Sequence, residues 1–131
     1  MKSNAALTLS LAVLAALFAS ACTTPVAIDP KTGQEQTARF TAGYFYGPID
    51  AEAGTIFRTA IRQLDNMGYF RTGELHKDAS ITIYARKVGD EKVTVRIAQL
   101  APGQCEMRIR VGSLGNLPES QKIYATIRDA L

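Results

Sequence analysis

Polar and apolar residues alternate strictly in three stretches of the second half of the chain, 81–86, 92–97 and 106–111. In each stretch the odd-numbered positions are apolar, and the even-numbered positions are mostly polar or charged. A period of two predicts β-strands that bury one face in a core and turn the other face to water. We therefore expect three neighbouring antiparallel strands whose odd-numbered side chains belong to the core.

Two other stretches carry apolar residues at the three- and four-residue spacing of an amphipathic helix. The first runs from Ala53 to Met67, and we expect Asp50 to cap its start and Gly68 to follow its end. The second begins near Pro118, a residue suited to the first turn of a helix, and continues to Leu131.

Short strands at 44–46 and 69–75 complete the pattern, which gives the order strand, helix, several strands, helix. This order predicts an α+β fold. We expect a two-layer sandwich in which two helices pack on one face of an antiparallel sheet of four to five strands. The other face of the sheet would then be free of helices.

The segment 101–103 is expected to form a three-residue hairpin loop, with its glycine in the left-handed conformation. Such a loop would place Ile97 opposite Met107 on the buried face and Arg96 opposite Arg108 on the helix-free face. This register keeps the apolar residues of both strands together, whereas a slip by one residue would separate them.

The helix-free face is consequently predicted to be cationic, with an aromatic ring among the charges. Its expected members are Tyr84, Arg86, Lys92, Arg96, Arg108 and Arg110. Like charges directly opposite one another usually destabilise a sheet. Two interpretations stay open. The face is a docking surface for an anion, such as a lipid phosphate, an acidic glycan or an acidic protein, or it is a solvated face whose arginines splay apart and are screened over about 8 Å.

The N-terminal segment has the parts of a secretory signal: the basic tip Met1-Lys2, an apolar run over 5–18, and small residues that lead to Cys22. The run is too short for a transmembrane helix, which needs about 20 residues. A cysteine after small residues resembles the lipobox of bacterial lipoproteins, although Ala19 stands where Leu is most frequent. The resemblance implies that Cys22 is acylated and becomes the first mature residue; a plain secretory signal remains the alternative.

This interpretation divides the chain into a signal peptide at 1–21, an acylated cysteine with a flexible tether at 22–39, and a single α+β domain at 40–131. The tether is expected because the segment is rich in Pro, Thr and Gln and poor in apolar residues. Since Thr23 rather than Asp follows the cysteine, the resemblance implies an outer-membrane location facing the periplasm.

The composition and the absence of catalytic and metal-binding motifs reduce the number of function classes that we expect for this chain. The formal net charge is +3 over 131 residues, which is too small to indicate nucleic acid as a partner. His76, the only histidine, falls in a predicted turn without further metal ligands nearby. Cys105 is expected to be a buried structural thiol. Because no phosphate loop, nucleophile motif or calcium loop is present, we expect neither a cofactor nor a metal nor enzyme activity.

The segments 43–44, 64–69 and 109–115, with the lipobox and Ser120 ahead of the terminal helix, resemble a family of small bacterial lipoproteins catalogued only as a domain of unknown function. The resemblance covers about 40–131. It implies a non-enzymatic envelope lipoprotein, attached to the membrane through its lipid anchor, that binds or scaffolds a partner such as an envelope protein or an anionic glycan or lipid. The alternative is an accessory subunit of an envelope protein assembly.

Overall fold

The computed structural model describes residues 22–28 and 32–131, which contain seven strands and two helices. The signal peptide expected at 1–21 lies outside these residues. The elements in chain order are β1 (Cys22–Ile28), β2 (Glu35–Thr41), β3 (Tyr44–Ile49), α2 (Ala53–Asn66), β4 (Phe70–Lys77), β5 (Ser80–Lys87), β6 (Glu91–Ala101), β7 (Gln104–Val111) and α3 (Leu117–Asp129).

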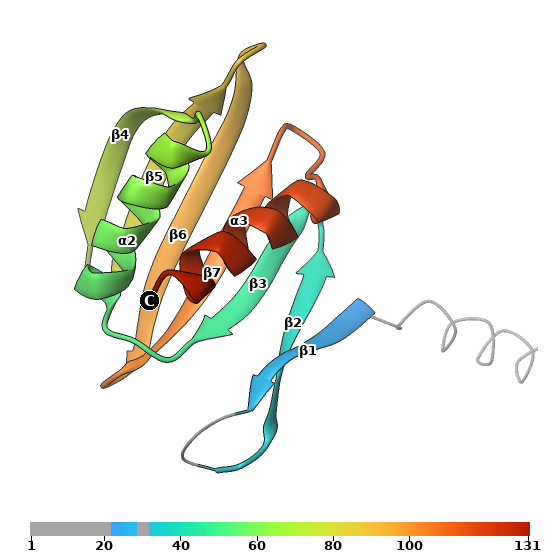
Figure 1. The fold of residues 1–131 in the computed structure, drawn as a ribbon, viewed down its shortest axis with the longest axis vertical. Coiled ribbons are helices and arrows are strands. Elements are labelled where there is room, and N and C mark those ends of the chain that lie inside the picture. Colours follow the sequence, from blue (N-terminus) through green and yellow to red (C-terminus); the bar gives the residue numbers. More distant parts are fainter. Residues whose placement is uncertain (1–21, 29–31) are drawn as a thin grey trace, which may run out of the picture.

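The strands form one antiparallel sheet in the order β1-β2-β3-β7-β6-β5-β4 (Figure 1). The predicted α+β class is confirmed. The predicted number of strands is wrong, since the described residues form seven strands rather than four to five. The two strands that were not expected, β1 and β2, occupy most of the segment 22–39 that we predicted to be a flexible tether.

Strands β1 and β2 could not be recognised from their composition, because only one face of this hairpin contacts the core. Ala38 is buried, and Val26 and Phe40 pack against the core, while the residues between them along β2 are exposed. The register of β1 shifts after Pro25. An edge strand accommodates proline because its outer side needs no ladder hydrogen bond.

The predicted register of β6 and β7 is confirmed, since residues 93–97 pair with residues 107–111. The predicted three-residue loop is wrong, because Ala101 pairs with Gln104 and leaves only two residues for the turn. A two-residue turn matches the twist of a hairpin well. A register shift near the end of β6 absorbs the remaining residue and restores the predicted pairing.

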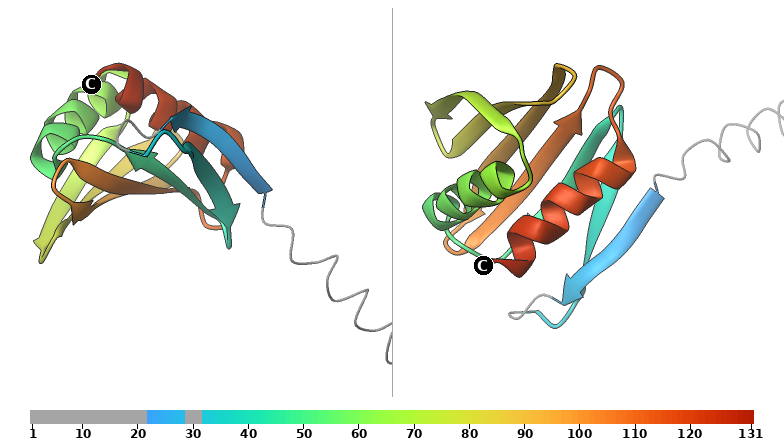
Figure 2. Two further views of the ribbon diagram at one scale, coloured as in Figure 1. Left: turned by 90° about the horizontal axis from the view of Figure 1, so that it is seen from below. Right: turned by 45° about the horizontal axis from the view of Figure 1, so that its top comes forward.

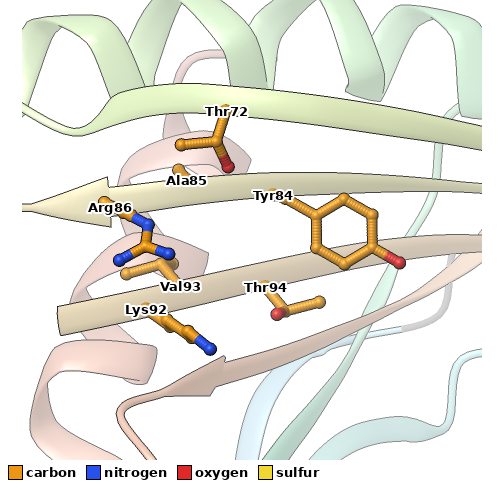
Figure 3. Close-up of a pocket in the computed structure, with 7 residues that line it drawn as sticks. All are labelled: Thr72, Tyr84, Ala85, Arg86, Lys92, Val93 and Thr94. Carbon is orange, nitrogen blue, oxygen red and sulfur yellow. The ribbon is translucent and has the colours of Figure 1, made fainter. Parts of the chain in front are cut away.

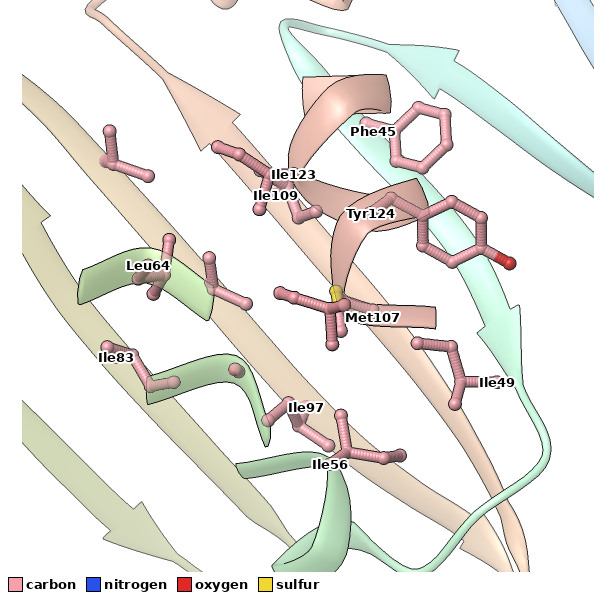
Figure 4. Packing of buried hydrophobic residues seen from close by; sticks show 14 of the residues in the cluster. Phe45, Ile49, Ile56, Leu64, Ile83, Ile97, Met107, Ile109, Ile123 and Tyr124 are labelled. Atoms are coloured by element: carbon pink, nitrogen blue, oxygen red, sulfur yellow. The ribbon is translucent and has the colours of Figure 1, made fainter. Parts of the chain in front are cut away.

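Both helices lie against the same side of the sheet (Figure 2). Helix α2 contacts β4, β5 and β6, helix α3 contacts β3 and β7, and the two helices contact each other. The core fills the space between helices and sheet (Figure 4), and its largest fully buried side chains include Ile56, Leu64, Ile83, Ile97, Met107, Ile109, Ile123 and Tyr124. No helix of the described residues covers the opposite face, which we call the exposed face.

A side chain from a distant strand caps the start of helix α2. The predicted cap, Asp50, instead accepts hydrogen bonds from the side-chain amide of Gln36, 3.0 and 3.1 Å away. The Oε1 atom of Gln99 in β6 accepts from the backbone N–H of Ala53 at 2.9 Å. Its Nε2 donates to Glu52, also at 2.9 Å. Thus one glutamine fixes the helix start to the end of β6.

Two other predictions about the helix ends are confirmed, whereas the predicted continuation of the second helix to Leu131 is wrong, because α3 ends at Asp129. Gly68 follows α2 with φ of 82°, a conformation that favours glycine. Pro118 lies in the first turn of α3, where the side chain of Asn116 accepts a hydrogen bond from the backbone N–H of Glu119 at 3.1 Å.

Candidate functional site

The exposed face carries a cluster of arginine and tyrosine side chains on three neighbouring strands. We name it the Arg–Tyr patch; it consists of Arg39 in β2, Tyr44 and Tyr46 in β3, and Arg108 and Arg110 in β7. Arg39 pairs with Tyr46, and Tyr46 pairs with Arg108, so these three residues form one row across the sheet. The residues that alternate with them in β3 and β7 are buried, which places the patch on the side away from the helices.

Each tyrosine ring of the patch is shared by two guanidinium groups. The Cζ atom of Arg108 lies 3.7 Å from the ring centroid of Tyr44, and that of Arg110 lies 4.6 Å from the same centroid. The Cζ atoms of Arg39 and Arg108 lie 4.1 and 5.6 Å from the centroid of Tyr46. All four distances fall within about 6 Å, the range of cation–π attraction. The rings therefore hold three like charges close together.

The three arginines of the patch differ in their other partners. Arg39 forms an ion pair with Glu106, with 3.2 Å between Nη1 and Oε2. Arg110 donates to two backbone carbonyl oxygens of the turn after β7. Within residues 22–28 and 32–131, no carboxylate lies within 4.0 Å of the guanidinium of Arg108, which donates instead to the hydroxyl of Tyr44. Its partners are thus the ring and hydroxyl of Tyr44 and the ring of Tyr46.

The arginines also change the acidity of Tyr44. The guanidinium of Arg110, followed by that of Arg108, holds the pKa of the Tyr44 hydroxyl below its ordinary value, against the weaker opposing effect of burial. A lowered pKa means that the surroundings favour the anionic form of the phenol. The same positive potential would favour an anionic ligand placed over the patch.

The basic residues predicted on β5 and β6 lie on the same face, beside the patch. Arg96 pairs directly with Arg108, and its Nη2 lies 3.5 Å from the hydroxyl oxygen of Ser80. Lys92 pairs with Arg86, which also forms an ion pair with an acidic residue of the turn between β5 and β6. The sequence therefore predicted correctly that these basic residues share one face.

Tyr84 also lies on the exposed face, where it pairs with Thr94, but no arginine stacks on its ring among the described contacts. It lines a hollow of about 340 Å³ together with Arg86 and Lys92, among other residues (Figure 3). In Figure 3 the two basic side chains gather at one end of the hollow and the tyrosine ring lies at the other. The hollow is thus a second basic and aromatic site beside the patch.

Three members of the patch were not predicted from the sequence: Tyr44, Tyr46 and Arg39. Arg39 fell in the expected tether, and the tyrosines were assigned to a strand with no known neighbour. Their spacing by two residues shows that they share a face, which is visible in the sequence. The pairing of β3 with β7, which brings them beside Arg108, is not visible there.

The reactive side chains lie on the helix side of the sheet. His76 belongs to β4 rather than to a turn, and its ring packs edge-on against Phe57, with 5.3 Å between ring centroids. Cys105 is buried as expected, with its Sγ 3.2 Å from the carbonyl oxygen of Ala51. Burial, followed by the charge of Glu52, raises the pKa of this thiol to about 11. Within the described part of the chain, no three His, Cys, Asp or Glu residues are grouped to hold a metal ion.

No helix of the described residues is long and apolar enough to cross a membrane.

Comparison with known proteins gives a family but no activity. A family model described as "Protein of unknown function (DUF3568)" matches residues 4–130. No curated protein matches the chain. The match confirms the expected resemblance to a family of unknown function.

Proposed function

Because the chain belongs to the DUF3568 family, whose function is unknown, we propose from its N-terminal sequence pattern and from the geometry of the exposed face that it is a lipid-anchored binding module of the bacterial cell envelope. Acylated Cys22 attaches it to the outer membrane on the periplasmic side. The domain is a two-layer sandwich, in which the helices fill one face of the sheet and the other face binds an anionic ligand. The protein catalyses no reaction and uses no cofactor.

The observation that carries this proposal is the state of Arg108. Its guanidinium lies over the ring of Tyr44, with the ring of Tyr46 farther off at 5.6 Å, and opposite Arg96, yet no carboxylate of the described residues lies within 4.0 Å of it. A guanidinium has five N–H donors, so its contacts with Tyr44 leave other donors available for a planar or tetrahedral anion. A charge arranged in this way favours an anion as its missing partner.

The stacking also lowers the cost of binding. A free arginine loses about 2 kcal/mol of side-chain entropy when it becomes ordered. Arg108 and Arg110 are already held by the ring of Tyr44, so part of this loss is incurred during folding rather than during binding. More of the interaction energy with the anion then appears as affinity.

The positions of the two reactive side chains support a non-enzymatic role. A thiol with a pKa of about 11, such as that of Cys105, is protonated at neutral pH and is a poor nucleophile. His76 lies on an edge strand with Glu74 at 3.3 Å, and neither residue has a nucleophile beside it among the described contacts.

Titration of the detergent-extracted full-length protein with pyrophosphate, followed by calorimetry, tests the binding proposal. Arg96→Gln/Arg108→Gln should weaken binding at least tenfold, because one hydrogen bond to a charged group is worth about 1.5–3 kcal/mol. The control, Arg58→Gln/Lys122→Gln, removes the same charge from exposed positions on the helices and should leave the affinity nearly unchanged. Equal losses in both double variants would show a general charge effect and contradict the proposal.

The anchor is tested separately by the intact mass of the membrane-extracted protein. We expect the mass of residues 22–131 plus acyl groups, and loss of both cleavage and acylation in a Cys22→Ala variant. A cleaved but unacylated chain would contradict the anchor and leave a soluble secreted protein.

A second candidate function, an accessory subunit of an envelope assembly, is favoured by the edge strand β4. All its residues are exposed, including Phe70 at 63% and Leu75 at 48%. The outer edge of such a strand, with apolar side chains beside it, is a site where another chain can add a strand. Such an apolar interface would persist at high salt, whereas anion docking would weaken steeply.

A further inference from the structure

We infer that Cys22 and the exposed face form one membrane-binding surface, in which the Arg–Tyr patch contacts the phosphates of acidic phospholipids in the anchoring membrane. The inference rests on the proposed function, because it takes Cys22 as the acylated residue. It goes further in naming the ligand and in assigning which side of the domain faces the bilayer.

The first step is that Cys22 belongs to the sheet rather than to a tether. Strand β1 begins at Cys22, whose backbone pairs with Phe40, and the next residue, Thr23, pairs with Arg39. A flexible tether of the expected length would let the domain stand about 20 Å away from the membrane. An acylated residue at the first position of a strand allows no such separation, so the edge of the sheet must stay at the headgroups.

The second step is the short distance from this edge to the patch. Thr23, Arg39, Tyr46 and Arg108 form one row across β1, β2, β3 and β7. Neighbouring strands lie about 4.8 Å apart, which puts Arg39 about 5 Å and Arg108 roughly 14 Å from β1. If the exposed face turns toward the bilayer, the whole patch therefore meets the headgroup layer.

The third step is that the exposed face combines basic residues with large apolar ones. Phe70 pairs with Arg86 and Leu75 pairs with Thr82, so both exposed apolar residues of β4 share the face of the patch. Tyr84, which is 41% exposed, lies on the same face. Membrane-surface elements combine basic and apolar side chains in this way, and tyrosine rings prefer the level of the headgroups.

The opposite side of the domain is a poorer match for an acidic membrane. The exposed positions on the two helices mix both charges, as in Arg58, Arg62, Lys122, Asp65 and Asp129. Each Lys or Arg near an acidic membrane raises affinity roughly fivefold, and acidic residues offset that gain. The distribution of charge and the exposed apolar side chains thus both favour an orientation in which the exposed face of the sheet contacts the membrane.

Site-directed spin labels on the full-length lipoprotein in vesicles test this orientation. One label replaces Thr72, an exposed residue of β4 at the far side of the sheet from the anchor, and the other replaces Gln121, exposed on α3. Cys105 is buried and should remain unlabelled. The measurement is the accessibility of each nitroxide to oxygen, which is concentrated in lipid, and to a water-soluble nickel chelate.

In vesicles of phosphatidylcholine with phosphatidylglycerol, we expect the label at Thr72 to be reached by oxygen and protected from nickel, and the label at Gln121 to show the reverse. The difference should be lost in pure phosphatidylcholine. It should also be lost in Arg96→Gln/Arg108→Gln/Arg110→Gln, and retained in the control Arg58→Gln/Arg62→Gln/Lys122→Gln. Thermal melting checks that each variant is folded, and Arg108→Lys provides a milder variant that keeps the charge.

Two other results separate this inference from the proposed function. If the two labels behave alike while the anchored protein still binds pyrophosphate, the face serves a soluble anion and the membrane orientation is wrong. If Cys22 proves to be unacylated, flotation of the unanchored protein with acidic vesicles tests the face alone. If the wild-type protein floats with the vesicles and the triple Gln variant does not, the result would support contact between the exposed face and lipid. If the wild-type protein does not float, the inference would be overturned.

Discussion

Gly47 keeps strand β3 close to helix α3, and its replacement by alanine tests how tightly the sheet and helix are packed. A Cβ atom at this position would lie 2.4 Å from Cε2 of Tyr124, 2.7 Å from Cζ and 2.8 Å from Cδ2. The ring cannot retreat easily, because Tyr124 is only 2% exposed and its hydroxyl donates to the carbonyl oxygen of Pro48. The added methyl group therefore requires the helix, the strand or the ring to shift.

The expected loss follows from the two contacts that the shift would damage. Overpacking a core by one methyl group costs about 1–3 kcal/mol. Displacement of the Tyr124 ring also weakens its hydrogen bond to Pro48, which contributes about 1 kcal/mol net. Gly47→Ala should thus lower the free energy of unfolding by about 3 kcal/mol, which corresponds to a fall in Tm of roughly 10 °C for a domain of this size.

Urea unfolding followed by circular dichroism measures this loss, and Gly73→Ala is the matched control. Gly73 lies in β4 and a Cβ there would meet no heavy atom within 4 Å. Its replacement should change stability by less than about 0.5 kcal/mol. If Gly47→Ala cost no more than Gly73→Ala, the ring of Tyr124 would have room to move, and the argument for close packing of β3 against α3 would be refuted.

Two further predictions concern contacts between distant elements. Gln99→Ala should cost about 2 kcal/mol, because it removes both the cap of α2 and a hydrogen bond to Glu52. Faster amide exchange in the first turn of α2 should accompany this loss, and unchanged exchange there would contradict the cap. The hydrogen bond from the hydroxyl of Tyr69 is the main reason that the pKa of Glu119 lies below its ordinary value, and the ion pair with Lys87 lowers this pKa further. Glu119→Gln should therefore lower stability above pH 5, and the difference from wild type should vanish as the pH falls through the lowered pKa. A difference that does not depend on pH, measured by unfolding at several pH values, would show that the carboxylate charge is not involved.

The parts of the fold that follow from local pattern could be predicted from the sequence. The pairing of 93–97 with 107–111 is one example, because both strands alternate clearly and a short hairpin joins them. Strands β1 and β2 could not be predicted, since their stability comes from backbone pairing of β1 with β2 and of β2 with β3, and from a few apolar contacts such as that of Ala38. Such tertiary effects leave little trace in composition.

In the candidate site, too, some residues could be predicted from the sequence and others could not. Arg96, Arg108 and Arg110 were found because they lie on two strands that are adjacent in the sequence and in the sheet. Tyr84 was expected among them for the same reason, as its strand is also adjacent in the sequence. The rings that stack on the arginines come from β3, which is separated from β7 along the chain by α2 and three strands. Only the topology of the sheet brings them together.

The geometry also decides how two arginines can lie directly opposite each other without a bound anion. Arg96 reaches toward Ser80 in β5, while Arg108 turns to Tyr44 in β3, so the two guanidinium groups point apart. Repulsion between the pair and cation–π attraction to the ring are each worth about 0.5–1 kcal/mol and roughly cancel. We therefore expect Arg108→Gln to change the free energy of unfolding by less than about 1 kcal/mol while it weakens anion binding at least tenfold. Unfolding and pyrophosphate titration of the same variant measure both effects. A loss above about 2 kcal/mol with intact binding would show that the patch stabilises the sheet and is not a binding site.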